Sequence, residues 1–216
     1  MALTEKTHAS GFLLSEASGN RSRDKGTLAS GQNLGAGTVL GKIKLGSAAV
    51  SGAGNTGTGT LTLDATTPKL AGAEPGNYVA TCILVATAGA VGTFRVENPE
   101  GVVLGDVLGT AIFADDIKFV IAPGTADFVL GDKFTINIAT AAGYFTLLGL
   151  TALDGSQHAA AILVADCNAS TAAAPCAVIA RDAEVITTEL TWPAAASAAE
   201  KALATDELAA LGIILR

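Results

Sequence analysis

The longest regular pattern in the chain is a series of short apolar–polar alternations between residues 59 and 138. Six segments of this kind follow one another: TLTLDAT, NYVATCILVAT, GTFRVEN, GVVLGDV, AIFADDIKFVIA and DFVLGDKFTINI. Alternation with a period of two is typical of a half-buried β-strand, and turn sequences such as EPGN, NPEG and APGT separate the segments. Because no helical period persists in this region, the pattern predicts an all-β module.

The C-terminal part of the chain follows a different pattern, with short strand candidates and then a helix. The strand candidates AAAILVAD, PCAVIARDA and ELTW precede the sequence PAAASAAEKALATDELAALGIILR. Ser197 and Glu200 match a capping box, in which each side chain satisfies an unpaired N–H of the first helical turn. Gly212 supplies a stop signal, and the apolar residues after it favour a final strand. The pattern predicts a helix over about 198–211.

The stretch SGAGNTGTGT contains Gly52, Gly54 and Gly57 in the spacing G-x-G-x-x-G. This spacing binds a dinucleotide pyrophosphate only where a strand enters it and a helix leaves it. The sequence that leaves here, TGTLTLDATT, has the period of a strand, and the acidic Glu74 lies in the turn sequence AEPGN. The sequence therefore favours a flexible junction over a nucleotide site.

Composition indicates a folded protein without a membrane span. Half of the 216 residues are apolar, yet no apolar run reaches the roughly 18 residues needed to cross a bilayer. Cys82, Cys167 and Cys176 are an odd number at wide spacing, which argues against a disulfide framework, and two histidines form no compact zinc pattern. The N-terminus lacks the features of a secretory signal, so we expect synthesis in the cytosol.

The net charge of −7 argues against wholesale binding to nucleic acid, which requires clustered Lys and Arg. Residues 1–46 contain six basic and three acidic residues, whereas residues 47–148 contain four and nine, and residues 149–216 contain three and eight. A weakly basic end therefore precedes an acidic body. An acidic protein partner suits that end as well as a nucleic acid does.

The acidic residues of the β-module do not have the spacing of a catalytic or metal site. Asp115 and Asp116 are adjacent, so in one strand they point to opposite faces and form no carboxylate pair. The repeated tetrapeptide VLGD places Asp106 and Asp132 at strand ends. We interpret these acids as solvated turn and edge residues, and the sequence predicts neither a cofactor nor a metal site.

Three segments near the C-terminus resemble the lambda-type head decoration proteins of tailed bacteriophages: LDGSQHAAAILVAD at 153–166, LTWPAAASAAEK at 190–201, and the final LGIILR. The start, GFLLSEASGNRSRDKGTLASGQNLGAGTVLGKI at 11–43, is similar to the N-terminal arm and first strands of that family. The resemblance implies a capsid-stabilising structural protein of the virion that forms trimers on the outer surface of the expanded head. It implies the major capsid protein and further copies of the chain as partners, with no nucleic acid, no membrane and no catalysis.

The predicted all-β segment separates the two halves of this resemblance. The expected fold class is therefore α+β and β-rich, with a small decoration-protein body that has one C-terminal helix and is interrupted by an all-β, sandwich-like insert. We expect a mobile arm over 1–24, a body over 25–46 and 147–216, and an inserted immunoglobulin-like domain over 47–146 that begins at the junction 51–60.

The resemblance and the residue types assign roles to residues outside the insert. In the arm, an apolar run and two arginines are expected to bind the coat protein, and the run adds a strand to a coat-protein sheet. Phe12 and Leu14 are expected on one side of this strand and Leu13 on the other. Trp192 and Pro193 are expected in the body core or the trimer interface. The arm residues are Phe12, Leu13, Leu14, Arg21 and Arg23.

Two other functions fit parts of the sequence. A virion-displayed module that binds a host or a carbohydrate would use the insert, but most aromatic residues of the insert lie at strand positions that suit core packing. An enzyme would need a nucleophile or an acid–base pair, and Ser156 and His158 lie in a polar turn without an orienting partner. The structural role is preferred, with the displayed module as the alternative.

Overall fold

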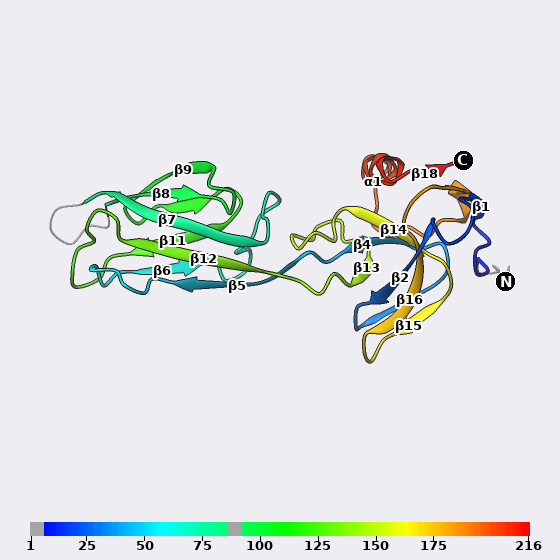
Figure 1. Ribbon diagram of the computed structural model, residues 1–216, viewed down its shortest axis with the longest axis horizontal. Coiled ribbons are helices and arrows are strands. Elements are labelled where there is room, and N and C mark those ends of the chain that lie inside the picture. The colour runs from blue at the N-terminus through cyan, green and yellow to red at the C-terminus, as the bar shows by residue number, and fades with distance from the viewer. Residues whose placement is uncertain (1–6, 86–91) are drawn as a thin grey trace. The chain divides into compact units, whose positions relative to one another are not determined.

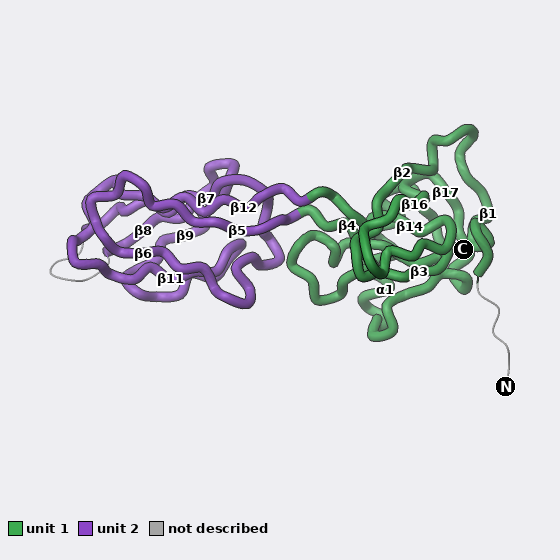
Figure 2. The backbone as a smooth tube through the Cα atoms, turned by 90° about the horizontal axis from the view of Figure 1, so that it is seen from below, with its two compact units in different colours: residues 1–44, 142–216 green, residues 45–141 purple. Residues whose placement is uncertain are grey.

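The computed structural model describes residues 7–85 and 92–216 and divides the chain into two compact units (Figures 1 and 2). Unit 1 comprises residues 1–44 and 142–216, and unit 2 comprises residues 45–141. Most of the regular secondary structure in the described residues is β-strand, and their one α-helix, α1 at Ala198–Ala210, lies in unit 1. The protein is therefore β-rich with a single C-terminal helix.

Unit 1 is built on a closed barrel of five strands in the order β13-β2-β16-β14-β4. The strands are Phe145–Leu147 (β13), Arg23–Leu28 (β2), Ala174–Ile179 (β16), Ala159–Leu163 (β14) and Val39–Lys42 (β4). Leu28, Leu40 and Leu163 are fully buried in one apolar cluster of the barrel. Glycine is required at Gly41, because a Cβ there would lie 1.9 Å from the carbonyl oxygen of Ser156.

A three-stranded sheet in the order β1-β17-β18 and the helix cover a second apolar cluster of unit 1. Its strands are Leu13–Glu16 (β1), Ala183–Val185 (β17) and Ile213–Leu215 (β18). The central β17 pairs antiparallel with β1 and parallel with β18. A two-stranded sheet of Cys167–Ala169 (β15) and Gln32–Leu34 (β3), and a 3₁₀ turn at Thr187–Glu189 (η1), complete the unit.

Helix α1 begins at the predicted capping box. The Glu200 N–H donates to the Ser197 hydroxyl, and the Glu200 carboxylate accepts from the Ser197 N–H at 2.8 Å. The helix ends at Ala210, and Gly212 follows with a φ of 79°, which is the left-handed conformation that favours glycine after a helix. Ala204 and Leu208 are the buried residues of the helix, and they pack in the second apolar cluster.

Unit 2 consists of two antiparallel sheets that share one apolar core. The larger sheet, β5-β12-β7-β8-β9, contains Leu45–Ser51 (β5), Lys133–Thr140 (β12), Gly76–Leu84 (β7), Thr93–Glu97 (β8) and Val103–Leu108 (β9). The smaller sheet, β10-β11-β6, contains Ile112–Ala114 (β10), Lys118–Ala122 (β11) and Thr60–Leu63 (β6). Tyr78, Phe94 and Ile136 from the first sheet and Phe119 and Ile121 from the second pack in the same cluster.

The observed limits of unit 2 differ from the expected 47–146. Leu45 begins β5 and lies opposite Thr140 in the β5–β12 ladder, so the chain enters and leaves unit 2 at paired neighbours. The glycine stretch 51–60 therefore contains the loop between β5 and β6, residues 52–59, and its interpretation as the entry junction is wrong. The error has a local cause, because the Ala- and Ser-rich sequence of β5 carries little of the β-branched pattern by which strands are recognised.

The glycine loop is held by a buried carboxylate. Asp132 is only 6% exposed, and its oxygens accept from the N–H groups of Thr56 and Gly57 at 2.9 Å and of Val129 at 3.1 Å. A Cβ at Gly57 would lie 2.4 Å from the Phe128 ring, so glycine allows this close approach. The interpretation of Asp132 as a solvated residue is wrong, because loop N–H groups that are shielded from water require an acceptor.

The other acids of unit 2 lie nearer the surface. Asp106 is exposed and pairs with Arg95 across β8 and β9, with 3.0 Å between Oδ1 and Nε. Asp115 and Asp116 lie in the bend between β10 and β11, so the segment AIFADDIKFVIA forms two strands and not one. The two adjacent acids therefore lie outside the strands, and the expectation that they point to opposite faces of one strand does not apply to them.

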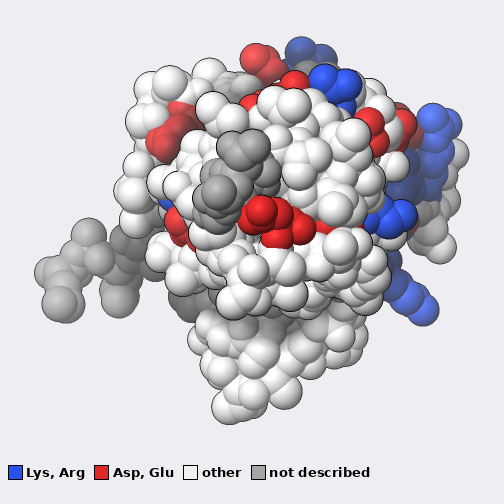
Figure 3. All heavy atoms as spheres, turned by 90° about the vertical axis from the view of Figure 1, so that its left-hand side faces the viewer, with Lys and Arg blue, Asp and Glu red and all other residues white. Residues whose placement is uncertain are grey.

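In the space-filling view of Figure 3, uncharged side chains cover most of the face that is shown, and a group of acidic side chains lies near its middle. Residues 52–59 and the turn at 109–111 contain no Asp, Glu, Lys or Arg. The glycine loop itself is therefore uncharged, whereas Asp127, which follows the Ala126 that hydrogen-bonds to Thr58, is exposed.

We expect unit 1 to fold without unit 2. Lys42 lies opposite Phe145 in the β4–β13 ladder, and the Ile43 N–H donates to the Tyr144 carbonyl at 2.9 Å. Because Ile43 and Tyr144 are hydrogen-bonded neighbours, Asn-Gly in place of residues 45–142 leaves a four-residue loop, Lys44-Asn-Gly-Gly143, that should join the two strands. The shortened chain should unfold cooperatively with a midpoint close to that of unit 1 in the full chain, measured by fluorescence of its single tryptophan, Trp192. A soluble but unfolded product would contradict this expectation.

Candidate functional site

The candidate site is the N-terminal segment, and the structure folds its described part onto unit 1 (Figure 1). Phe12 is fully buried in the second apolar cluster, and Leu13 packs against the same cluster. The Phe12 carbonyl also accepts from the Ile186 N–H at 2.8 Å. The expectation of a mobile arm is therefore wrong for residues 7–24, because Phe12 and Leu13 pack in the core of their own chain. Residues 1–6 lie outside the described part.

Strand β1 contains an irregularity that turns one leucine outward. Leu13 lies opposite Val185 and Ser15 opposite Glu184, so the register shifts between them. Leu14, at this bulge, is 53% exposed. The expectation that Phe12 and Leu14 share one side of the strand is wrong, since an extra residue in one strand breaks the simple alternation. Of the apolar run in the arm, Leu14 is the residue that faces solvent.

Both arginines of the arm have acidic partners within unit 1. The Arg23 guanidinium contacts both Glu16 carboxylate oxygens, at 2.7 and 2.9 Å, and this hydrogen bonding holds the pKa of Glu16 below its ordinary value. Arg21 Nε lies 2.8 Å from Asp182 Oδ2, yet the Arg21 side chain remains 70% exposed. Arg21 is therefore the more accessible arginine for a partner, whereas Arg23 closes the loop between β1 and β2.

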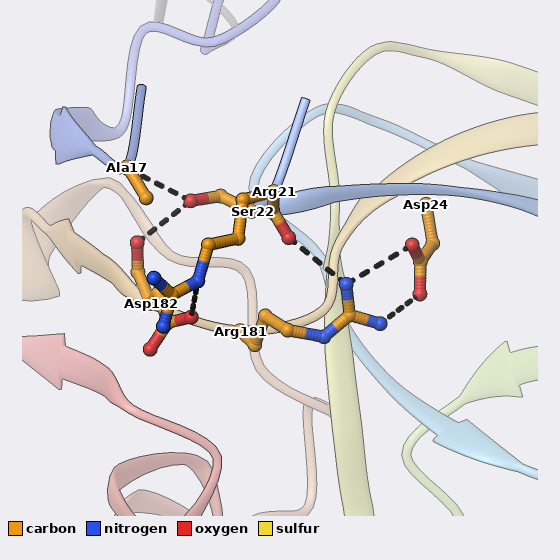
Figure 4. Close-up of polar contacts among 6 residues, drawn as sticks. All are labelled: Ala17, Arg21, Ser22, Asp24, Arg181 and Asp182. Atoms are coloured by element: carbon orange, nitrogen blue, oxygen red, sulfur yellow. Dashed lines mark hydrogen bonds and ion pairs between the residues drawn. The ribbon is translucent and has the colours of Figure 1, made fainter. Parts of the chain in front are cut away.

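The loop between β1 and β2 is anchored by a buried serine (Figure 4). Ser22 is fully buried, and its hydroxyl accepts from the Ala17 N–H at 2.9 Å and donates to the Asp182 carbonyl at 2.7 Å. Asp182 itself has a φ of 47°, a left-handed conformation that Asp tolerates better than most residues. The serine thus joins two chain segments that are distant in sequence.

A second contact fixes the other side of this loop (Figure 4). The Arg181 guanidinium donates to the Arg21 carbonyl at 2.9 Å and pairs with the Asp24 carboxylate. Sequence reasoning missed Ser22, Arg181 and Asp182 as anchors, because no local pattern shows that residues about 160 positions apart are neighbours. The loop is positioned by the body, so it presents Arg21 in one defined place.

Replacing Ser22 by alanine should lower the free energy of unfolding of unit 1 by about 1–3 kcal/mol, because it leaves the Ala17 N–H and the Asp182 carbonyl without their buried partner. Urea unfolding followed by Trp192 fluorescence measures this loss. Ser18→Ala, at an exposed position of the same loop, is the matched control and should leave stability almost unchanged. Equal effects of the two substitutions would show that the serine is not an anchor.

The remaining predicted residues of the body lie close to the arm. Trp192 is half-buried and packs against the cluster that contains Phe12, and Pro193 is buried. The backbone before them is fixed to β4, because the Val39 N–H donates to the Thr191 carbonyl at 3.0 Å. Both residues therefore contribute to packing of the body.

Ser156 and His158 are held by different partners. The Ser156 hydroxyl donates to Asp154 at 2.6 Å, whereas His158 Nδ1 lies 2.5 Å from the Glu207 carboxylate on α1. Within residues 7–85 and 92–216, no three His, Cys, Asp or Glu side chains are grouped so that they could hold a metal ion. No helix in this part of the chain is long and apolar enough to cross a membrane.

Comparison with known families decides the assignment of the chain. The family described as bacteriophage lambda head decoration protein D matches residues 2–213. The chain belongs to this head decoration protein family. It is a family of structural phage capsid proteins and not of enzymes, so the head decoration protein described here associates with the phage capsid. No curated protein matches the chain.

Two solved structures show a distant likeness to this head decoration protein. Both are crystal structures of Xanthomonas campestris FlgL, with sequence identities of 19% and 21% and TM-scores of 0.28 and 0.29. The matched regions cover 48% and 47% of this chain, and 32% and 33% of the FlgL chains. The head decoration protein thus spans about a third of the FlgL chains it matches, and at these TM-scores the likeness supports no conclusion on fold or function.

Proposed function

We propose that this head decoration protein is made in the cytoplasm of the host bacterium, binds as trimers to the outer surface of the expanded phage head and stabilises the head against the pressure of packaged DNA. The family match over residues 2–213 carries the proposal. A protein that binds the assembled shell but not its dissociated subunits stabilises the shell by mass action. A trimer adds to this effect, because three linked contacts bind far more tightly than one.

The contact with the coat protein is proposed at β1 and the loop that follows it. In the sheet β1-β17-β18, β1 is an outer strand, so its outer edge offers backbone groups to a further strand. A coat-protein strand added there gains backbone hydrogen bonds, while the exposed Leu14 and Arg21 supply side-chain contacts. Phe12, Leu13 and Arg23 act indirectly, because they hold β1 and its loop in position.

The two units are proposed to have separate roles. Unit 1 is the decoration body and contains the trimer contacts, to which the half-buried Trp192 and the adjoining Pro193 contribute. Unit 2 is proposed to be an autonomous immunoglobulin-like sandwich inserted at the end of the β4–β13 pair. The paired entry and exit at Leu45 and Thr140 support this arrangement, since insertions succeed where the two chain ends lie close together.

Two measurements test the proposed function. Light scattering after size exclusion should give the mass of a trimer, because a ring of three repeats one heterologous contact by rotation. A monomer or a dimer at micromolar concentration would contradict this part. Expanded shells saturated with the protein should disassemble at a higher temperature than bare shells, and an unchanged temperature would contradict the stabilising role.

A further inference from the structure

The outer face of the sheet β10-β11-β6 in unit 2 carries a groove of about 160 Å³. The strand register places two rows of side chains next to one another on this face. The first row consists of two apolar side chains followed by a threonine hydroxyl, and the second row contains a Lys–Asp ion pair. The rows are Ile112–Val120–Thr62 and Ala114–Lys118–Asp64.

The apolar part of the groove is accessible. Ile112 is 64% exposed, and Val120 beside it is partly exposed, although both lie in regular strands. Beneath them, Phe119 is buried and stacks on Phe113 with 5.1 Å between ring centroids. The floor of the groove is therefore a firm aliphatic surface, supported by the aromatic core of unit 2.

The polar edge of the groove is fixed and has no net charge. Lys118 Nζ lies 2.9 Å from Asp64 Oδ2. The other Asp64 oxygen accepts from the N–H groups of Thr66 and Thr67 at 3.0 and 2.8 Å. The Thr67 N–H, with Lys118 and the Thr66 N–H, holds the pKa of Asp64 far below its ordinary value. The Asp64 carboxylate is thus a permanent acceptor, and Lys118 keeps further N–H donors for a ligand.

This combination of groups selects the chemistry of a ligand. An anion would meet the Asp64 carboxylate and the acidic excess of unit 2, where residues 45–141 contain nine acidic and four basic residues. A cation would meet the Lys118 ammonium. A fully apolar ligand would cover the ion pair without replacing the water that solvates it. An uncharged ligand with hydroxyls along one edge and C–H groups on one face avoids both charge repulsion and the loss of hydrogen bonds to the ion pair.

We propose that the groove binds one neutral pyranose ring. The C–H face of the ring lies on Ile112 and Val120, and its hydroxyls exchange hydrogen bonds with Lys118, Asp64 and Thr62. The size of the groove agrees with a single ring, since pockets for drug-sized ligands are larger, about 300–1,000 Å³. This sugar site goes beyond capsid decoration and does not depend on it.

A single shallow groove of this kind should bind weakly, with a dissociation constant on the order of 1 mM. Copies displayed together on one particle would bind a surface that carries many sugars much more tightly, because the later contacts become intramolecular. Weak individual binding and strong collective binding are therefore the expected behaviour of this site.

Saturation-transfer NMR on the free, full-length protein tests the site. The probes are the methyl pyranosides of glucose, galactose, mannose and N-acetylglucosamine, each at about 10 mM so that a millimolar site is well occupied. At least one should show saturation transfer, strongest at its ring C–H protons. Absence of transfer to all four sugars would overturn the proposal, and so would equal competition by hexanoate, which would indicate a general apolar site.

Two variants locate the binding. Ile112→Asp places a charge on the apolar floor, and Lys118→Met removes the ammonium, so each should weaken binding at least about tenfold, which a difference of 1.4 kcal/mol produces. Leu108→Asp is the matched control, because Leu108 is 69% exposed in β9, a strand of the other sheet, and does not line the groove. Melting curves verify folding. Unchanged transfer in folded Ile112→Asp, or equal loss in Leu108→Asp, would overturn the assignment to this groove.

Discussion

Phe12→Ala should lower the free energy of unfolding of unit 1 by about 3–5 kcal/mol, which is typical of removing a fully buried phenylalanine. Phe12 has no exposed surface and packs in the cluster that also contains Val39, Val185 and Leu208. Its loss leaves a cavity among β4, β17 and α1, elements that come from distant parts of the chain. Urea unfolding followed by Trp192 fluorescence measures the change, since Trp192 packs against the same cluster.

Leu14→Ala is the matched control for Phe12→Ala. Leu14 lies two residues away but is more than half exposed, so its truncation should change stability by no more than about 0.5 kcal/mol. It should nevertheless weaken binding to the coat protein, because Leu14 is the outward-facing apolar residue of β1. If Phe12→Ala were as stable as Leu14→Ala, the N-terminal segment would not be part of the body.

Asp132→Ala should lower the free energy of unfolding of unit 2 by about 3 kcal/mol or more, because hydrogen bonds to a charged group each contribute about 1.5–3 kcal/mol and three backbone donors lose their acceptor together. The donors belong to Thr56, Gly57 and Val129, which lie in two different loops. The near-ultraviolet circular dichroism of Tyr78, the only tyrosine of unit 2, reports its unfolding.

The control for Asp132→Ala is Asp106→Ala in the same unit. Asp106 is exposed and its partner Arg95 is equally accessible, so the loss of this surface pair should have little effect. In hydrogen exchange, the amides of Thr56 and Gly57 should lose protection in Asp132→Ala and keep it in Asp106→Ala. A similar response to both substitutions would show that the Asp132 carboxylate does not organise the loops.

The Asp132 carboxylate also predicts how the stability of unit 2 depends on pH. Burial raises the pKa of Asp132, but the hydrogen bonds from Thr56, Gly57 and Val129 lower it more, so the folded pKa lies below its ordinary value. Because the folded pKa is lowered, the Asp132 carboxylate contributes fully to the stability of unit 2 above the unfolded pKa of about 3.9. This contribution to stability is lost as the pH falls through the folded pKa. Asp132→Asn should therefore flatten the acid-induced loss of stability in unit 2.

Local sequence patterns were sufficient to predict those helices and strands whose sequence motifs span only a few residues. The capping box of Ser197 and Glu200 and the stop at Gly212 are local chemistry, and the structure has both. The alternation of apolar and polar residues likewise predicted the strand positions in most of unit 2. Strand β5 was missed because its sequence is rich in Ala and Ser and contains few of the β-branched and aromatic residues typical of strands. Its backbone nevertheless pairs with β12.

The candidate site could not be predicted from the same signals. The polar surroundings of Phe12 suggested a mobile arm, but its burial depends on β17 and α1, which lie more than half the chain away in sequence. Asp132 looked like an ordinary turn residue because nothing near it in sequence shows that the glycine loop folds over it. Burial is a property of the tertiary structure, so a short polar segment and a buried anchor have the same local appearance.

The central claim is that unit 1 binds the capsid and that unit 2 is not required for binding. Co-sedimentation with decoration-free expanded shells tests it most directly, with the full chain compared with the chain in which Asn-Gly replaces residues 45–142. Both proteins should sediment with the shells and saturate them at the same number of copies and with similar affinity. Failure of the full chain to sediment would contradict capsid decoration, and binding by the full chain but not by the folded, shortened chain would contradict the assignment of capsid binding to unit 1.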